Sequence, residues 1–171
     1  FNQPRSVATI NADPILNLVD QFTFEAWIKP IDWSDAASGY NMIFSKGSVE
    51  LYLNKNEDDQ QKENTIVLML YSEDGTKYYL RSEQNIFSFG EWMHIAAVYN
   101  AANSEAKIYK NGRALNLTPY DQLPSGNLKN NETQKIAIGN KTFPSHAFYG
   151  IIDEARLWSY DRSGNEISAN F

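Results

Sequence analysis

The sequence contains no cysteine, and this absence removes several chemistries at once. Disulfide bridges, thiolate metal sites and cysteine nucleophiles are all excluded. Histidine is scarce as well: His94 and His146 are the two in the chain. Neither has sequence neighbours that would complete a metal triad or a Ser-His-Asp set.

Clustered positive charge and long apolar runs are also missing. The 15 Lys and Arg residues are scattered among 21 Asp and Glu residues, and the formal net charge is −6. The electrostatic footprint of a nucleic-acid binder is therefore absent. No run approaches the roughly 18 apolar residues of a transmembrane helix. We expect no nucleic-acid partner and no insertion into a membrane.

What the sequence does contain fits one domain over residues 1–171. A chain of this length with 42% hydrophobic residues can bury one sizeable core. The chain starts at Phe1 rather than Met, so we expect it to be a piece of a larger polypeptide, with neighbouring domains among its contacts.

Short apolar segments rich in aromatic and β-branched residues recur between turn residues, which favours an all-β domain. Many such segments can form a two-sheet jelly roll or a closed barrel. Several are apolar on both faces, which favours a two-sheet antiparallel sandwich. We predict strands over 6–11, 22–30, 42–47, 49–55, 65–72, 77–83, 92–100, 105–115, 134–140 and 148–159.

Turn and cap signals support these boundaries. Glu73-Asp74-Gly75 and Asn111-Gly112 predict two hairpins, because Gly accepts the positive φ that tight turns require. Near the C-terminus, Ser163 followed three residues later by Glu166 predicts a capping box and one helical turn.

The last predicted strand raises a question about Asp153. Strict alternation would place Asp153 with Ile151 and Leu157, on the face that looks most like core. A buried carboxylate has to be paired, hydrogen-bonded or coordinated. Three partners stay open: an arginine (Arg156 or Arg5), backbone N–H groups, or a calcium ion with oxygen ligands.

Four segments together carry a family resemblance. FTFEAWIKP, FGEWMHIAAVYN, AKIYKNGRAL and FYGIIDEARLWSYDRSGNEI are similar, in order and spacing, to landmarks of the laminin-G-like jelly roll of the concanavalin A-like lectin and glucanase superfamily. The resemblance spans residues 1–171. It implies two antiparallel sheets, a structural calcium ion, and glycan or protein binding at an extracellular or cell-surface location.

The resemblance also favours calcium among the three possible partners of Asp153. Similar domains place an ion between an aspartate of the final strand and the N-terminal segment, and Asn2 is the expected second ligand.

The loop over residues 31–41 is the expected ligand site, because variable loops carry binding in such folds. Trp33, with Asp35 and Tyr40 nearby, could stack on a sugar ring while polar groups meet its hydroxyls. The alternative for Trp33 is that it closes the end of the sandwich. We expect the other landmark tryptophans, Trp27, Trp92 and Trp158, to pack in or beside the core.

Catalysis is the weaker hypothesis. Glycosidases need two carboxylates on one face, whereas Asp153 and Glu154 are adjacent and would point to opposite faces of a regular strand. We therefore expect a noncatalytic module that binds a glycan or an extracellular protein. The alternative is a structural or adhesion domain that contacts proteins or neighbouring domains and binds no sugar.

Overall fold

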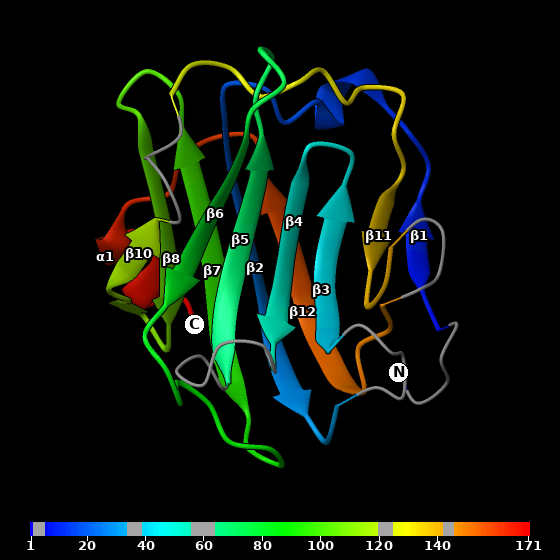
Figure 1. Ribbon diagram of the computed structural model, residues 1–171, viewed down its shortest axis with the longest axis vertical. Helices are drawn as coiled ribbons and strands as arrows, with labels where there is room; N and C mark the ends of the chain where they lie inside the picture. Colours follow the sequence, from blue (N-terminus) through cyan, green and yellow to red (C-terminus); the bar gives the residue numbers. More distant parts are fainter. Residues whose placement is uncertain (2–5, 34–38, 56–63, 120–124, 142–145) are drawn as a thin grey trace.

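The computed structural model describes residues 1, 6–33, 39–55, 64–119, 125–141 and 146–171. In this part of the chain, two antiparallel sheets face each other, and the predicted sandwich is confirmed. In Figure 1, strands β3, β4 and β5 of the first sheet cross in front of β2 and β12 of the second. No helix of the described residues is long and apolar enough to cross a membrane.

The first sheet has seven strands in the order β1-β11-β3-β4-β5-β6-β10. Their bounds are β1 Ala8–Ile10, β3 Tyr40–Lys46, β4 Val49–Asn54, β5 Thr65–Tyr71, β6 Lys77–Ser82, β10 Leu117–Pro119 and β11 Ile136–Ile138. The second sheet has five strands in the order β12-β2-β7-β8-β9. Their bounds are β2 Gln21–Pro30, β7 Met93–Asn100, β8 Glu105–Lys110, β9 Arg113–Ala114 and β12 Gly150–Trp158.

Two short helices complete the fold: the 3-10 helix η1 (Pro14–Leu16) and helix α1 (Gly164–Ala169). The predicted capping box of α1 is confirmed, with both hydrogen bonds between Ser163 and Glu166 present. Both predicted hairpins are confirmed as well. Tyr71 pairs with Lys77 across the first turn, and Lys110 pairs with Arg113 across the second.

The core lies between the sheets and follows from alternation along the strands. In β2, Phe22, Phe24 and Ile28 are completely or almost completely buried. Phe24 stacks on Phe44 of the opposite sheet with ring centroids 4.4 Å apart. Because alternate side chains leave each strand on opposite sides, the residues between these core positions lie on the outer faces.

Lys46, at the end of β3, is a buried cation. Its side chain is 0% exposed, and Nζ donates to the carbonyl oxygens of Asn131 (2.8 Å) and Gln134 (2.7 Å). Burial lowers the pKa of the ammonium below its usual value. The side chain of Asn131 in turn accepts from the backbone N–H of Leu18 and donates to Ser48 Oγ. This network fixes residues 131–134 against the β3–β4 turn.

Candidate functional site

The outer face of the seven-stranded sheet carries a row of tyrosines. Register places Tyr52 of β4 opposite Met42 of β3 and Val67 of β5, all on the outer side, because Leu51 and Leu53 point into the core. We define the tyrosine face as the outward side chains that form this second hydrophobic cluster: Tyr40, Met42, Tyr52, Val67, Met69, Tyr71 and Tyr79.

Aromatic contacts order one end of the tyrosine face. Tyr40 meets Tyr52 edge to face with ring centroids 4.9 Å apart. On its other side Tyr40 stacks on His146 at 5.5 Å. Tyr40 and Tyr79 are half-buried, so parts of their rings stay exposed to solvent. Such rings offer flat apolar surface next to hydroxyl groups.

The phenol of Tyr52 stays neutral. Burial raises the pKa of Tyr52 well above its usual value, and Tyr40, Glu50 and Tyr79 act in the same direction. Glu50 lies on the same face and forms an ion pair with Lys141 at 3.0 Å. The Tyr52 hydroxyl can therefore donate and accept hydrogen bonds throughout the physiological pH range.

Two ammonium groups contact Tyr71 at the other end of the tyrosine face. Lys77 Nζ is 5.6 Å and Lys129 Nζ is 4.9 Å from the centroid of the Tyr71 ring. Both distances fall in the range of a cation–π interaction. Lys77 and Lys129 are exposed and Tyr71 is half-buried, so this end of the face is accessible.

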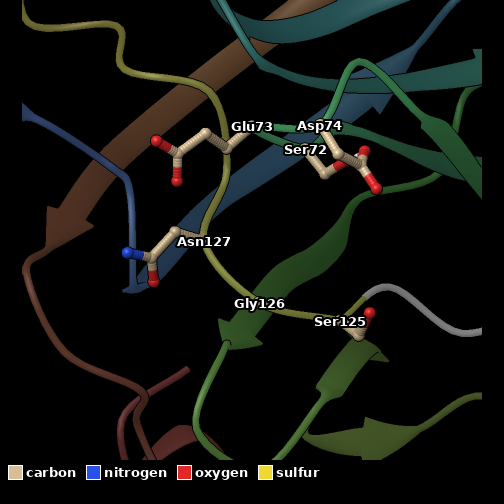
Figure 2. A pocket seen from close by; sticks show the side chains of 6 residues that line it. All are labelled: Ser72, Glu73, Asp74, Ser125, Gly126 and Asn127. Carbon is tan, nitrogen blue, oxygen red and sulfur yellow. Dashed lines mark hydrogen bonds between the residues drawn. The ribbon is translucent and has the colours of Figure 1, made fainter.

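A cavity of about 380 Å³ adjoins this end at the rim of the sheet. We call it the rim pocket, and Figure 2 shows the residues that line it: Ser72, Glu73, Asp74, Ser125, Gly126 and Asn127. The pocket and Tyr71 are neighbours along the backbone, because Ser72 follows Tyr71 and the backbone N–H of Lys129 donates to the carbonyl of Tyr71 at 2.8 Å.

The polar groups of the rim pocket divide into two sets. Asp74 accepts from Ser72 Oγ and from the backbone N–H of Thr76, and these bonds lower the pKa of its carboxyl, with Ser72 the larger cause. Figure 2 shows Glu73 and Asn127 extending to the side of the pocket away from Asp74. The turn thus occupies Asp74, while hydroxyl, amide and carboxylate groups of other residues line the cavity.

The outer face of the five-stranded sheet carries a buried ionic network instead. Glu25 Oε1 accepts from Arg162 Nη1 (2.5 Å) and from Trp158 Nε1 (3.0 Å). Arg162 Nη2 donates to the carbonyl of Glu166 in α1, and its guanidinium lies 4.8 Å from the Trp158 ring centroid. We call Glu25, Trp158 and Arg162 the helix brace, because they attach α1 to the sheet.

His94 lies beside the helix brace and is 1% exposed. Its Nε2 is 3.7 Å from Glu25 Oε2, and burial is the main cause that lowers the pKa of the imidazole. The ring packs against Trp27 and Phe171. This agrees with a structural role for His94.

The predicted position of Asp153 on the core face is wrong. The β12–β2 register shifts between Asp153 and Arg156, and Glu154 has a φ of +48°. This β-bulge moves Asp153 to the outer side with Arg156 and leaves it exposed. Its Oδ1 accepts from the backbone N–H of Glu154 at 2.8 Å. The carboxylate is therefore exposed to water, and the argument that a buried Asp153 needs an ion to neutralise it no longer applies.

The N-terminal residue does lie beside β12, but backbone hydrogen bonds hold it. The Phe1 ammonium donates to the Gly150 carbonyl at 2.8 Å, and the Gly150 N–H donates to the Phe1 carbonyl at 2.9 Å. Asn2, the other predicted calcium ligand, lies outside the described residues. Among the described residues there is no group of three or more His, Asp or Glu that could hold a metal ion.

Calcium stays a prediction, and titration with the ion tests it. If calcium joins Asp153 to the N-terminal segment, the native state gains about 2.7 kcal/mol at a calcium concentration of 100 times Kd. We then expect thermal unfolding of the parent to move to higher temperature with calcium, and that of Asp153→Ala to stay unchanged. A parent that unfolds at the same temperature in calcium and in EDTA would contradict the predicted calcium site.

The two predicted ligand residues that the structure describes, Trp33 and Tyr40, do not come together in one contact set. Trp33 packs edge to face against Phe87 (6.0 Å) and Phe89 (5.3 Å) beside the main core, as in the alternative interpretation. Tyr40 belongs to the tyrosine face. Asp35 lies outside the described residues. A ligand-binding role for Trp33 and Asp35 stays a prediction.

The other tryptophans require a correction. Trp27 and Trp158 are half-buried on the outer face of the five-stranded sheet, and Trp92 is 44% exposed. The expectation of core packing is therefore wrong for Trp92. Sequence reasoning also missed Tyr52, Tyr71 and Tyr79, because their alternation with leucines does not say which of the two faces is turned outward.

Comparison with known proteins identifies the fold and family. A model of the concanavalin A-like lectin/glucanases superfamily matches residues 4–168. No curated protein sequence matches the chain.

Three similar solved structures illustrate the fold. The binding domain of botulinum neurotoxin serotype G has a TM-score of 0.70 at 14% identity, over 98% of this chain and 40% of that one. A heptameric SAP-like pentraxin from Limulus polyphemus has a TM-score of 0.62 at 16% identity, and the match covers 98% of this chain and 82% of the pentraxin chain. Domain 4 of an extracellular arabinanase from Geobacillus stearothermophilus, in complex with arabinotriose, has a TM-score of 0.66 at 18% identity. The match covers 99% of this chain and 73% of the arabinanase chain. The chain thus spans less than half of the neurotoxin domain.

Proposed function

Because the chain belongs to the concanavalin A-like lectin/glucanase superfamily, we propose that it is a noncatalytic module that binds a glycan on its tyrosine face. The module would belong to an extracellular or cell-surface protein. The observation that carries the proposal is the row of half-buried tyrosines on an outer sheet face, beside a cavity lined by polar groups. Flat rings next to hydroxyls, amides and carboxylates match the alternating C–H faces and hydroxyls of a sugar.

The solved structures support the binding class. The arabinanase domain is in complex with arabinotriose, and the neurotoxin neighbour is a binding domain. At 14–18% identity these structures share the fold, and their ligands suggest a class of ligand for this chain without identifying it.

The carboxylates of the site support binding rather than hydrolysis. Glycosidases place two carboxyl groups on opposite sides of the scissile bond. On the outward positions of β3, β4, β5 and β6, register places one carboxylate, Glu50, and it is in an ion pair with Lys141. In the rim pocket, Asp74 is held by the turn.

Removing one tyrosine ring tests the proposal. We expect Tyr79→Ala to weaken binding to a glycan from an immobilised panel about 10-fold, because stacking on one ring contributes about 0.5–1.5 kcal/mol beyond the area it buries. Tyr149→Ala is the matched control: Tyr149 is 36% exposed and lies outside the tyrosine face. Isothermal titration with the best panel ligand measures both variants. Equal affinities for Tyr79→Ala and the parent would contradict the proposal.

One observation favours the second candidate, a protein-contact or adhesion domain. Ile31, Trp92, Tyr149 and Ile151 are 36–50% exposed. Ile151 pairs with Lys29, and Ile31 donates to the Tyr149 carbonyl, so three of the four lie near one end of β12. Exposed apolar groups that lie together often mark protein contacts. A parent that is silent on all glycans, together with self-association or partner capture lost in Ile151→Ser, would favour this candidate.

A further inference from the structure

We propose that the glycan is acidic, and that Lys77 and Lys129 hold its carboxylate or sulfate group over Tyr71. This inference rests on the proposed function, since it names the chemical class of the ligand for the same face. The shared chemistry is an oxyanion carried on a sugar ring, and the experiment below separates its two possible sources.

The backbone fixes the two lysines on either side of the strand that carries Tyr71. Lys77 of β6 is the Cα partner of Tyr71, so both side chains leave the sheet on the same face. On the other side, the Lys129 N–H donates to the Tyr71 carbonyl, and Leu128 next to it is bridged to Ser72. Neither lysine reaches Tyr71 by a chance surface rotamer alone, because both backbones are tied to the strand that carries the ring.

The two ammonium groups are uncompensated in the structure. Their described contacts are with the Tyr71 ring, at 5.6 Å and 4.9 Å, and within the described ranges neither forms an ion pair. This is unusual in a chain with a net charge of −6, where acidic partners are abundant. A cation–π contact orients an ammonium without neutralising it, so both groups remain able to bind an anion.

Two of the nearby carboxylates have partners of their own. Glu50 is paired with Lys141, and Asp74 is bound to Ser72 and Thr76 of its own turn. Figure 2 shows the Glu73 carboxylate on the side of the rim pocket away from Asp74. There it can accept from the hydroxyls of a neighbouring sugar, while the acidic sugar lies at the lysines.

Together these features describe a two-part recognition. The rim pocket of about 380 Å³ offers neutral hydrogen-bonding groups from Ser125 and Asn127. Next to it, the half-buried Tyr71 ring holds two exposed ammonium groups, those of Lys77 and Lys129. A polymer with an anionic substituent on one ring and hydroxyls on the next fits both parts, whereas a neutral polymer leaves the ammonium groups unused.

The experiment compares matched glycans that differ in charge. Polygalacturonate is set against its methyl-esterified form, and a sulfated galactan against the unsulfated galactan. We expect the parent to bind at least one anionic form about 10-fold more tightly than its neutral counterpart in low salt, with the difference falling as salt screens it. Binding of polygalacturonate assigns a carboxylate, and binding of the sulfated polymer alone assigns a sulfate.

Two double variants decide whether the lysines are responsible. Lys77→Gln with Lys129→Gln should abolish the preference for the anionic form and leave affinity for the neutral form within about 2-fold. Lys107→Gln with Lys135→Gln removes the same charge from exposed or half-exposed positions outside the tyrosine face and should leave the preference intact.

The outcomes separate this inference from the proposed function. Tight binding of neutral glycans with no preference for charge overturns the acidic ligand and leaves the glycan module standing. An equal loss of preference in both double variants shows unspecific attraction and also overturns the inference. A parent that binds no glycan of the panel, neutral or anionic, overturns both.

Discussion

Replacing Glu25 with Gln is expected to lower the free energy of unfolding by about 3–5 kcal/mol, among the largest effects available in this chain. The side chains of Glu25 and Arg162 are 1% and 5% exposed, and their bond is 2.5 Å long. The amide keeps the shape of the carboxylate but removes its charge. The buried guanidinium then loses its counterion while water remains excluded. Denaturant unfolding followed by tryptophan fluorescence measures the loss.

The neighbouring Arg156 provides the control. Arg156 Nη1 is 3.9 Å from Glu25 Oε1, but its side chain is 39% exposed. We expect Arg156→Gln to cost less than about 1 kcal/mol, because a solvated ion pair contributes little. In a cycle with Arg162→Met, the double variant should lose much less than the two single losses added together, since the partners act as one unit. If the two single losses of unfolding free energy simply add up in the double variant, Glu25 and Arg162 do not interact.

The sandwich itself could be predicted because its signals are local. Phe22, Phe24 and Ile28 alternate with outward residues through β2, and the structure confirms both faces of that strand. The hairpin at Asn111-Gly112 and the cap at Ser163 depend on a few neighbouring residues. The predicted laminin-G-like family is confirmed by the match over residues 4–168, which contains all four landmark segments.

Asp153 shows where alternation fails. A regular strand predicts its face by counting in twos, but one bulge reverses every later position. The bulge depends on the positive φ of Glu154, a conformation that a non-glycine residue adopts at an energetic cost. No local sequence pattern predicts it. The notion of a buried carboxylate, and with it the physical argument for calcium, followed from the missed bulge.

The tyrosine face shows a different limit. In β5, Ile66, Leu68 and Leu70 fill the core, while Val67 and Met69 between them are also apolar. Alternation groups Tyr71 with Val67 and Met69, but it does not say which group meets the opposite sheet. That choice depends on contacts between strands distant in sequence. The loop around Trp33 carries the clearer local signal for a site, because its composition is polar.

Lys46 was equally invisible in sequence, since a lysine at the end of a strand usually reaches solvent. The structure buries it completely because residues 131–134 fold over the β3–β4 turn. Gly47 permits this approach. It has a φ of +52°, and a Cβ there would lie 2.8 Å from the Cβ of Asn131. The ammonium thus takes the position beneath the loop where it satisfies two carbonyl groups.

Lys46→Ala is the second change for which we expect a large loss, about 2–4 kcal/mol of unfolding free energy. Removing a fully buried stem leaves a cavity. The Asn131 carbonyl, which accepts from Nζ in a buried position, loses its donor, and an unsatisfied buried acceptor costs about 1–3 kcal/mol. The Gln134 carbonyl belongs to an exposed residue and can return to water. Denaturant unfolding of the variant and the parent measures the difference.

Lys46→Met separates the two contributions, because it keeps most of the stem and removes the charge. Loss of the hydrogen bonds destabilises this variant, whereas relief of the buried ammonium, whose pKa burial already lowers, stabilises it. We therefore expect Lys46→Met to fall between the parent and Lys46→Ala. A Met variant as stable as the parent would mean that packing of the stem alone accounts for the loss. A Met variant as unstable as Ala would mean that the two carbonyl contacts hold residues 131–134 in place.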